Sequence, residues 1–242
     1  MLKEMCYHLI KKQRFYMFEI LKKENLNQKM IDKFEKFNII LKEWNSKFNL
    51  TSITDDLDVE IKHFLDSIKG ERYFFKNANV VEIGSGGGFP SIPLMIIRSD
   101  LKFTLIESVG KKCEFLKFAI KELDLNGEVL NLRAEDCGKN EKYREKFDIV
   151  TARAVAKLNT LSEYCIPLIK KGGLFIAYKG EDNGEEIEGA NAIKILGGRY
   201  KEKSTYTLYN NEINRTLHII EKVENTPSKY PRGNGKERSK PL

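Results

Sequence analysis

Residues 80–90 read VVEIGSGGGFP, in which an apolar run leads directly into alternating glycines. The run predicts a buried strand, and the glycines let the backbone that follows it approach a ligand closely. In an open parallel sheet, this turn from strand to helix is where nucleotides and related ligands bind. The dinucleotide pattern G-x-G-x-x-G is absent, because its last glycine would fall at Phe89 or Ser91.

Short apolar runs alternate with helical stretches after this segment. Strands are predicted at Val80–Ile83, Phe103–Ile106, Val129–Leu132, Phe147–Val150 and Leu174–Tyr178, and helices at Ser91–Arg98, Lys111–Leu123, Leu158–Leu168 and Glu185–Leu196. Two further strands, Thr205–Tyr209 and Thr216–Ile220, predict an antiparallel hairpin at the sheet edge. The pattern indicates an α/β, Rossmann-like fold with a mostly parallel sheet that is covered on both faces.

The first part of the chain is helical instead. Apolar residues recur in steps of four and three from Met30 to Phe48, which predicts an amphipathic helix, and Tyr7–Leu21 is also helix-like. We therefore expect a helical extension over residues 1–70 and an α/β domain over residues 71–224. The basic segment 225–242 holds three of the six prolines and is expected to lack regular structure.

Composition excludes several classes of protein. With 242 residues, 41% hydrophobic and 32% charged, the chain is neither disordered, collagen-like nor a disulfide scaffold. Its four cysteines and three histidines have no metal-motif spacing, so we expect reduced thiols and no metal. No apolar run is long enough for a membrane span or a signal core, which favours a cytoplasmic protein.

Charge is concentrated at the C-terminal end. Residues 225–242 carry five basic side chains and one acidic one, more than half of the net charge of +7. The segment is either a solvated tail or an arm that binds a polyanion such as RNA.

The glycine loop has an acid two residues before it. The spacing Glu82-x-Gly84-x-Gly86-x-Gly88 resembles the first motif of class I S-adenosylmethionine-dependent methyltransferases, whose ligand carries a cationic ammonium and a sulfonium that an acid can bind. Nucleotide binding and a purely structural turn remain alternatives on the loop alone. Glu107 ends the second strand, 23 positions after Gly84, where an acid can accept both ribose hydroxyls.

The end of the third strand adds a further element. Ala134 and Glu135 follow it, where a backbone amide and a side chain can bracket an adenine edge. The ends of the first three predicted strands thus each contribute residues to one predicted site for the adenosyl group.

The residues after the fourth strand limit the methyl acceptor. Residues 151–156 read TARAVA, without the Pro-Pro-aromatic turn that commonly serves amine methylation, and the chain has no Pro-Cys pair for carbon-5 methylation. Guanine N7 remains plausible, because it carries no proton and needs no general base. Arg153 would then position the base, a phosphate or the cofactor carboxylate, unless it is an ordinary arginine paired with a nearby carboxylate.

Several segments together closely resemble the RsmG (GidB) family of bacterial 16S ribosomal RNA guanine-N7 methyltransferases. They are residues 49–53 (NLTSI), His63 with Asp66 and Ser67, residues 82–90, residues 107–112 (ESVGKK), residues 133–135 (RAE), residues 151–156, Lys179 with Gly180, and residues 229–232 (KYPR). Ser91 departs from the glycine that the family often has there.

The resemblance implies a seven-stranded fold, S-adenosylmethionine as cofactor with S-adenosylhomocysteine as product, and the small ribosomal subunit as partner. Loss of such enzymes is associated with streptomycin resistance. The implied cofactor contacts are Gly84, Phe89, Glu107, Ser108, Val109, Ala134, Glu135 and Arg153. His63 and Asp66 would orient the RNA or cap a helix.

Basic side chains would approach the RNA phosphates. We assign Lys111, Lys112, Lys179 and Arg232 to this role, and we expect a monomer. Two alternatives stay open: a methyltransferase for a small molecule or protein, and a non-catalytic S-adenosylmethionine-binding factor in ribosome assembly. The charge of the tail argues against the first of these.

Overall fold

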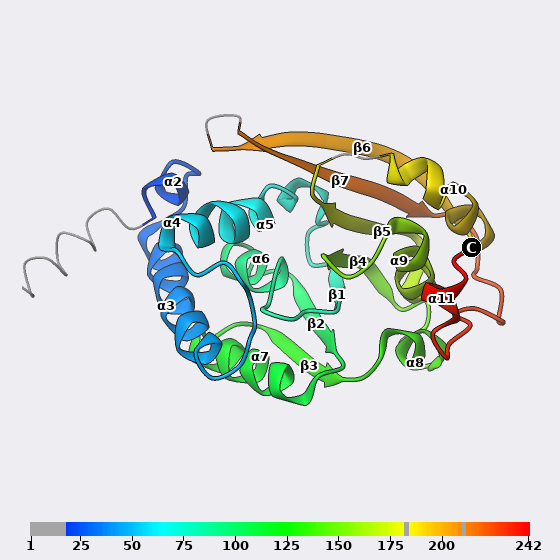
Figure 1. The fold of residues 1–242 in the computed structure, drawn as a ribbon, viewed down its shortest axis with the longest axis horizontal. Helices are drawn as coiled ribbons and strands as arrows, with labels where there is room; N and C mark the ends of the chain where they lie inside the picture. Colours follow the sequence, from blue (N-terminus) through cyan, green and yellow to red (C-terminus); the bar gives the residue numbers. More distant parts are fainter. Residues whose placement is uncertain (1–17, 182–183, 210–211) are drawn as a thin grey trace, which may run out of the picture.

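A seven-stranded sheet organises the computed structural model, which describes residues 18–181, 184–209 and 212–242 (Figure 1). Its order is β3-β2-β1-β4-β5-β7-β6. The strands are β1 (Asn79–Ile83), β2 (Lys102–Glu107), β3 (Gly127–Asn131), β4 (Phe147–Arg153), β5 (Ile169–Lys179), β6 (Gly198–Leu208) and β7 (Ile213–Lys222). The first five run parallel and β7 pairs antiparallel with both β5 and β6, as the sequence predicts.

Helices cover both faces of the sheet and divide its core in two. One cluster packs beneath α3 (Gln28–Asn45), α6 (Ser91–Ile97) and α7 (Gly110–Glu122), and the other beneath α8 (Ala134–Lys139), α9 (Leu158–Cys165) and α10 (Glu185–Ile195) (Figure 1). The helix predicted over Leu158–Leu168 is shorter than expected. Pro167 cannot continue the α-helical hydrogen bonding, so residues Ile166–Leu168 form the 3-10 helix η3.

The N-terminal helices pack onto the sheet as part of the first core cluster. The apolar face of α3 buries Phe34 and Phe37, whose rings lie 5.1 and 5.6 Å from that of Phe64. Phe64 belongs to a π-helical turn, η1 (Glu60–Leu65), between α4 (Asp56–Val59) and α5 (Asp66–Ile68). Most of the predicted helix Tyr7–Leu21 lies outside the described residues, and its described end forms part of the short α2 (Glu19–Lys22). The 3-10 helix η2 (Glu71–Tyr73) follows α5 and precedes β1.

The C-terminal tail folds back onto α8 and α9 and contains a short helix, α11 (Lys236–Ser239) (Figure 1). Apart from α11 the segment lacks regular structure, as expected, but it packs against the protein and is not solvated along its whole length. Arg144 holds the tail backbone, donating to the carbonyls of Tyr230 and Thr226, both at 2.7 Å. Tyr230 is buried and only 6% exposed.

Arg232 explains why the tail docks. Its guanidinium makes a bidentate contact with Glu163, with Nη2 to Oε2 at 2.7 Å, and the Glu163 side chain is only 1% exposed. A buried carboxylate requires such a partner. Arg232 is therefore engaged within the protein, and its expected contact with RNA phosphates stays a prediction.

Replacement of Arg232 by alanine should destabilise the fold by about 3 kcal/mol, because Glu163 would remain buried without a partner. Thermal unfolding of the purified variant measures this. Lys240→Ala removes an exposed charge from the same tail and serves as the control, for which we expect a melting temperature close to that of the unaltered protein. Equal melting temperatures for the two variants would contradict the docking of the tail through Arg232.

Candidate active site

The glycine loop turns sharply at the carboxyl end of β1. Gly84 and Gly88 have φ angles of +69° and +84°, which side chains other than glycine rarely adopt. A Cβ on Gly84 would also lie 2.8 Å from Val155 Cγ2. The backbone amide of Gly84 donates to the carbonyl of Ile106 at 2.9 Å, which ties the loop to the end of β2.

Glu107 fixes the loop from the neighbouring strand. Its Oε2 accepts from the backbone amide of Gly86 at 2.9 Å, and its Oε1 accepts from that of Val109 at 2.8 Å. The carboxylate therefore joins the loops after β1 and β2. Each oxygen retains a second lone pair, so the same group can still accept the hydroxyls of a ribose.

Glu82 lies in β1, wholly buried, and neither of its carboxylate oxygens has a hydrogen-bond partner in the structure. Burial raises the pKa of Glu82 to about 8, against smaller opposing effects of Ser91 and Ser85. An orphaned carboxyl at this position suits a ligand that brings a cation, since the buried group would gain a charged partner. The residues present therefore fit S-adenosylmethionine, which carries an ammonium group.

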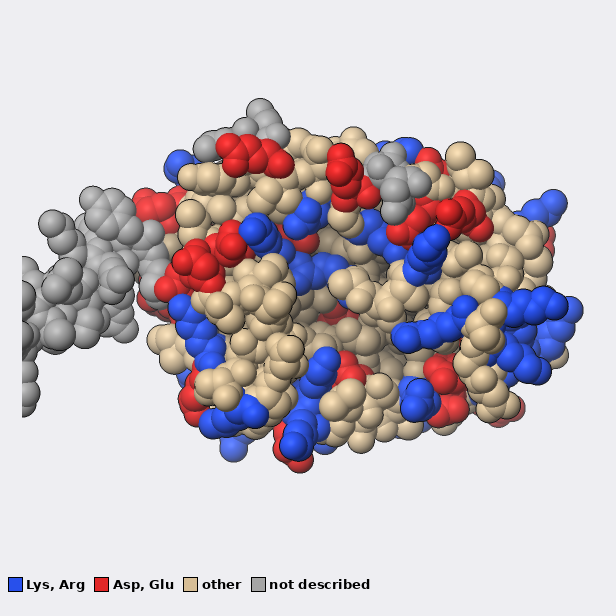
Figure 2. All heavy atoms as spheres, in the orientation of Figure 1, with Lys and Arg blue, Asp and Glu red and all other residues tan. Residues whose placement is uncertain are grey.

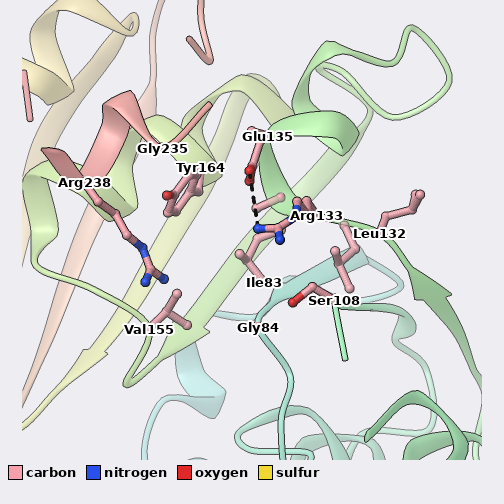
Figure 3. A pocket seen from close by; sticks show the side chains of 12 residues that line it. Ile83, Gly84, Ser108, Leu132, Arg133, Glu135, Val155, Tyr164, Gly235 and Arg238 are labelled. Atoms are coloured by element: carbon pink, nitrogen blue, oxygen red, sulfur yellow. Dashed lines mark ion pairs between the residues drawn. The ribbon is translucent and has the colours of Figure 1, made fainter. Parts of the chain in front are cut away.

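A cavity of about 340 Å³ opens where the carboxyl ends of β1 to β4 meet (Figure 3). It collects four of the predicted cofactor residues. The lining residues are Ile83, Gly84, Ile106, Ser108, Leu132, Arg133, Ala134, Glu135, Val155, Tyr164, Gly235 and Arg238. The sequence does not predict Tyr164, which comes from α9, or the two tail residues, which reach the pocket only because the tail folds back onto α9.

Arg153 belongs to a second cluster, between β4 and the N-terminal helices. Its Nη1 donates to Asp66 Oδ2 and to the carbonyl of Lys62, both at 3.0 Å, and its Nη2 donates to His63 Nδ1 at 2.7 Å. The structure thus unites Arg153, His63 and Asp66, which the sequence singles out separately. Arg153 also forms an ion pair with a nearby carboxylate, that of Asp66, which is the structural role considered as the alternative to a positioning role.

His63 is held as a neutral ring. Burial and the neighbouring charge of Arg153 lower the pKa of His63 to about 3. Because a guanidinium can only donate, Nδ1 must accept, and the ring proton lies on Nε2, 2.9 Å from Thr51 Oγ1. The His63 ring stacks on the Phe89 ring, with 4.3 Å between their centroids. The Arg153 guanidinium lies 5.0 Å from the centroid of the Phe89 ring.

Asp66 is almost fully buried and has partners beyond Arg153. Tyr206 donates to its Oδ1 at 2.8 Å, and Arg215 lies 3.5 Å from the same oxygen. Tyr206 and Arg215 come from β6 and β7, and no local pattern marks them. Only the packing of the hairpin against η1 could reveal them.

The predicted phosphate-binding lysines differ in their surroundings. Lys111 is exposed and Lys112 half-buried at the start of α7, whereas Lys179 pairs with Glu185 at 2.7 Å and is only 12% exposed. Figure 2 shows a face that is hollowed near its centre, with Lys and Arg side chains at several places around the hollow.

No metal centre or membrane span is found in the part of the chain that the structure describes. Its His, Cys, Asp and Glu side chains form no group of three or more that could hold a metal ion. None of its helices combines the length and the apolar character that a bilayer crossing needs.

Fold and pocket define a class I S-adenosylmethionine-dependent methyltransferase. A solved methyltransferase of this kind from Methanosarcina mazei has the same fold, with a TM-score of 0.51 and 13% identity over 63% of this chain and 96% of that one. The chain belongs to the GidB family, rRNA small subunit methyltransferase G, whose model matches residues 30–216.

Two relatives carry the name ribosomal RNA small subunit methyltransferase G. The protein from Lactobacillus acidophilus is 45% identical over 90% of this chain and 93% of its own length. The Staphylococcus aureus protein is 45% identical over 94% of this chain and 97% of its own length. The expected family, fold class and cofactor are thereby confirmed.

The raised pKa of Glu82 predicts a pH-dependent stability. The folded protein holds this proton more tightly than the unfolded chain, so the free energy of unfolding falls as the pH rises from about 4.5 to about 8. Glu82→Gln cannot ionise. Between pH 5 and pH 8 it should therefore gain roughly 3 kcal/mol relative to the unaltered protein.

Urea unfolding of the ligand-free protein at both ends of this pH range measures the difference. Glu224→Gln, which alters an exposed carboxyl, is the control and should follow the unaltered protein. Parallel pH curves for Glu82→Gln and the unaltered protein would show that Glu82 has an ordinary pKa.

Proposed function

We propose that this methyltransferase modifies N7 of one guanine in the 16S ribosomal RNA of the small ribosomal subunit. Membership of the GidB family and relatives named ribosomal RNA small subunit methyltransferase G support a small-subunit RNA substrate. The atom that is methylated is argued from the chemistry of the site.

The observation that carries the proposal is that three titratable groups beside the glycine loop, His63, Asp66 and Glu107, already have partners within the protein. Both ring nitrogens of His63, both oxygens of Asp66 and both oxygens of Glu107 have partners within the protein. Glu82 is wholly buried. No group in this set is placed as a general base, which suits an acceptor whose attacking atom carries no proton.

When bound, S-adenosylmethionine would supply an electrophilic methyl group on its sulfonium, with S-adenosylhomocysteine as the product. The lone pair of guanine N7 would form the new N–C bond as the S–C bond breaks, and because no proton leaves, the base would become cationic. Positioning then provides most of the rate enhancement.

Arg153 is the positioning residue in this proposal. A free guanidinium near N7 would oppose the charge that develops there. Here Asp66, only 5% exposed in its side chain, neutralises Arg153 at 3.0 Å, so the arginine can orient a base with less electrostatic penalty. The stacked rings of Phe89 and His63 lie beside the Arg153 guanidinium and limit its movement.

The guanine must be presented outside its stack, because the attacking atom has to reach the cofactor pocket. Single-stranded loops present bases in this way. Lys111 and Lys112, at the start of α7, would contact the phosphates beside such a base in this proposal.

Direct methylation identifies the substrate. Purified protein and labelled S-adenosylmethionine are incubated with small subunits, naked 16S RNA and bulk tRNA from cells that lack the gene, and N7-methylguanosine is mapped by chemical strand scission. We expect modification of a single 16S guanine. Binding of the cofactor without labelling of any RNA would favour a small-molecule or protein acceptor, or a non-catalytic factor.

Arg153→Ala should lower kcat about 100-fold, because the acceptor loses its orientation. Arg153→Lys should also fail to restore the rate, since an ammonium cannot reproduce the fork that binds Asp66 and His63 together. Initial rates with varied RNA and cofactor measure both variants. Arg199→Ala, in an exposed ion pair on β6, is the control. Full activity of Arg153→Lys would show that only the charge matters.

Loss of Lys111 and Lys112 together should weaken RNA binding roughly tenfold and reduce the slope of log affinity against log salt by about two. Filter binding of small-subunit RNA over a salt series measures this. Lys121→Ala, exposed in the last turn of the same helix, should change neither quantity. An unaltered slope in the double variant would remove these lysines from the RNA interface.

A further inference from the structure

The C-terminal tail contributes two residues, Gly235 and Arg238, to the cofactor pocket. In Figure 3, Arg238 reaches from α11 toward Val155 and lies across the pocket from Ser108 and Leu132. The pocket therefore has a wall that comes from outside the α/β domain. The glycine loop and the strand ends are held by their own contacts, so the tail residues at the pocket are available for a role in ligand binding.

Arg238 is held in place by its neighbour in the chain. Glu237 is fully buried, its backbone carbonyl accepts from Thr160 Oγ1 at 2.9 Å, and its carboxylate accepts from the backbone amide of Gly233. Together with the ion pair between Arg232 and Glu163, these contacts fix α11 against α9. Arg238 thus approaches the pocket from a rigid support.

The charge of Arg238 is available to a ligand. Within residues 18–181, 184–209 and 212–242, no carboxylate forms an ion pair with it, whereas carboxylates pair with the arginines Arg153, Arg199, Arg215 and Arg232. Its neighbour at the pocket is Tyr164, whose ring is nearly buried. Because Arg238 has no ion-pair partner among the described residues and points into the pocket, its guanidinium is suited to contact a ligand bound there.

The composition of the pocket indicates which part of the cofactor lies there. Ser108 follows β2 and Ala134 and Glu135 follow β3, the positions that suit the ribose and the adenine. A planar guanidinium can lie flat on an aromatic ring and attract it.

We propose that Arg238 covers the adenine face of S-adenosylmethionine and that the folded tail completes the adenosine half of the cofactor site. This inference rests on the assignment of the pocket to S-adenosylmethionine. It gives the tail a role in cofactor binding, in addition to any contact with RNA.

Calorimetric titration without RNA tests the proposal with two probes, S-adenosylhomocysteine and 5′-methylthioadenosine, which lacks the amino-acid part. Arg238→Ala should weaken both about tenfold, and Arg238→Lys should recover only part of the loss. Lys236→Ala, an exposed residue of the same short helix that does not line the pocket, should bind both probes normally. Thermal unfolding verifies that each variant is folded.

Three results would overturn the inference. Unchanged binding of both probes with a raised KM for RNA would make Arg238 an RNA contact. Weaker binding of S-adenosylhomocysteine alone would place Arg238 at the amino-acid end, and complete rescue by lysine would exclude stacking. If the unaltered protein bound neither probe, the pocket assignment itself would fail.

Discussion

The carboxylate of Glu107 joins the two loops that form the cofactor pocket, and the rest of the site depends on this junction. It accepts backbone amides from Gly86 and Val109, one from each loop. Hydrogen bonds to an ionised acceptor are stronger than those between neutral groups. Because β1 and β2 are adjacent and parallel, a single side chain at the end of β2 can reach both loops. The glycine loop is thereby held in a shape that leaves Glu82 buried beneath it.

Electrostatics separates the site into two regions with different tasks. At the end of β1, the two carboxylate oxygens of Glu82 have no hydrogen-bond partner within the described residues and can gain one from a ligand. At the end of β4, Arg153 already has Asp66 and His63, and Asp66 in turn has Tyr206 and Arg215. These contacts hold the Arg153 guanidinium in one orientation, which is consistent with an acceptor that requires placement more than proton transfer.

The sequence predicts those parts of the structure that depend on local pattern. The alternation of apolar runs locates all seven strands, and the residues directly after β1, β2 and β3, among them Gly84, Ser108 and Glu135, line the pocket as predicted. It does not predict the π-helical turn that presents His63, since such a turn arises from packing against α2 and α3. The docking of the tail is not predicted for a similar reason. Charge counting cannot reveal that Glu163, in another element, is buried and needs Arg232.

The two ends of the described chain approach the site from opposite faces of the sheet. The N-terminal helices bring His63 and Asp66 to Arg153, while the tail brings Arg238 to the pocket. Each contact joins residues far apart in the sequence, so neither half of the site can form from the α/β core alone. A ligand that binds at these contacts will stabilise the docked helices and tail, since binding to the folded state alone shifts the folding equilibrium. With the role proposed for Arg238, cofactor affinity and the docking of the tail are coupled in this fold.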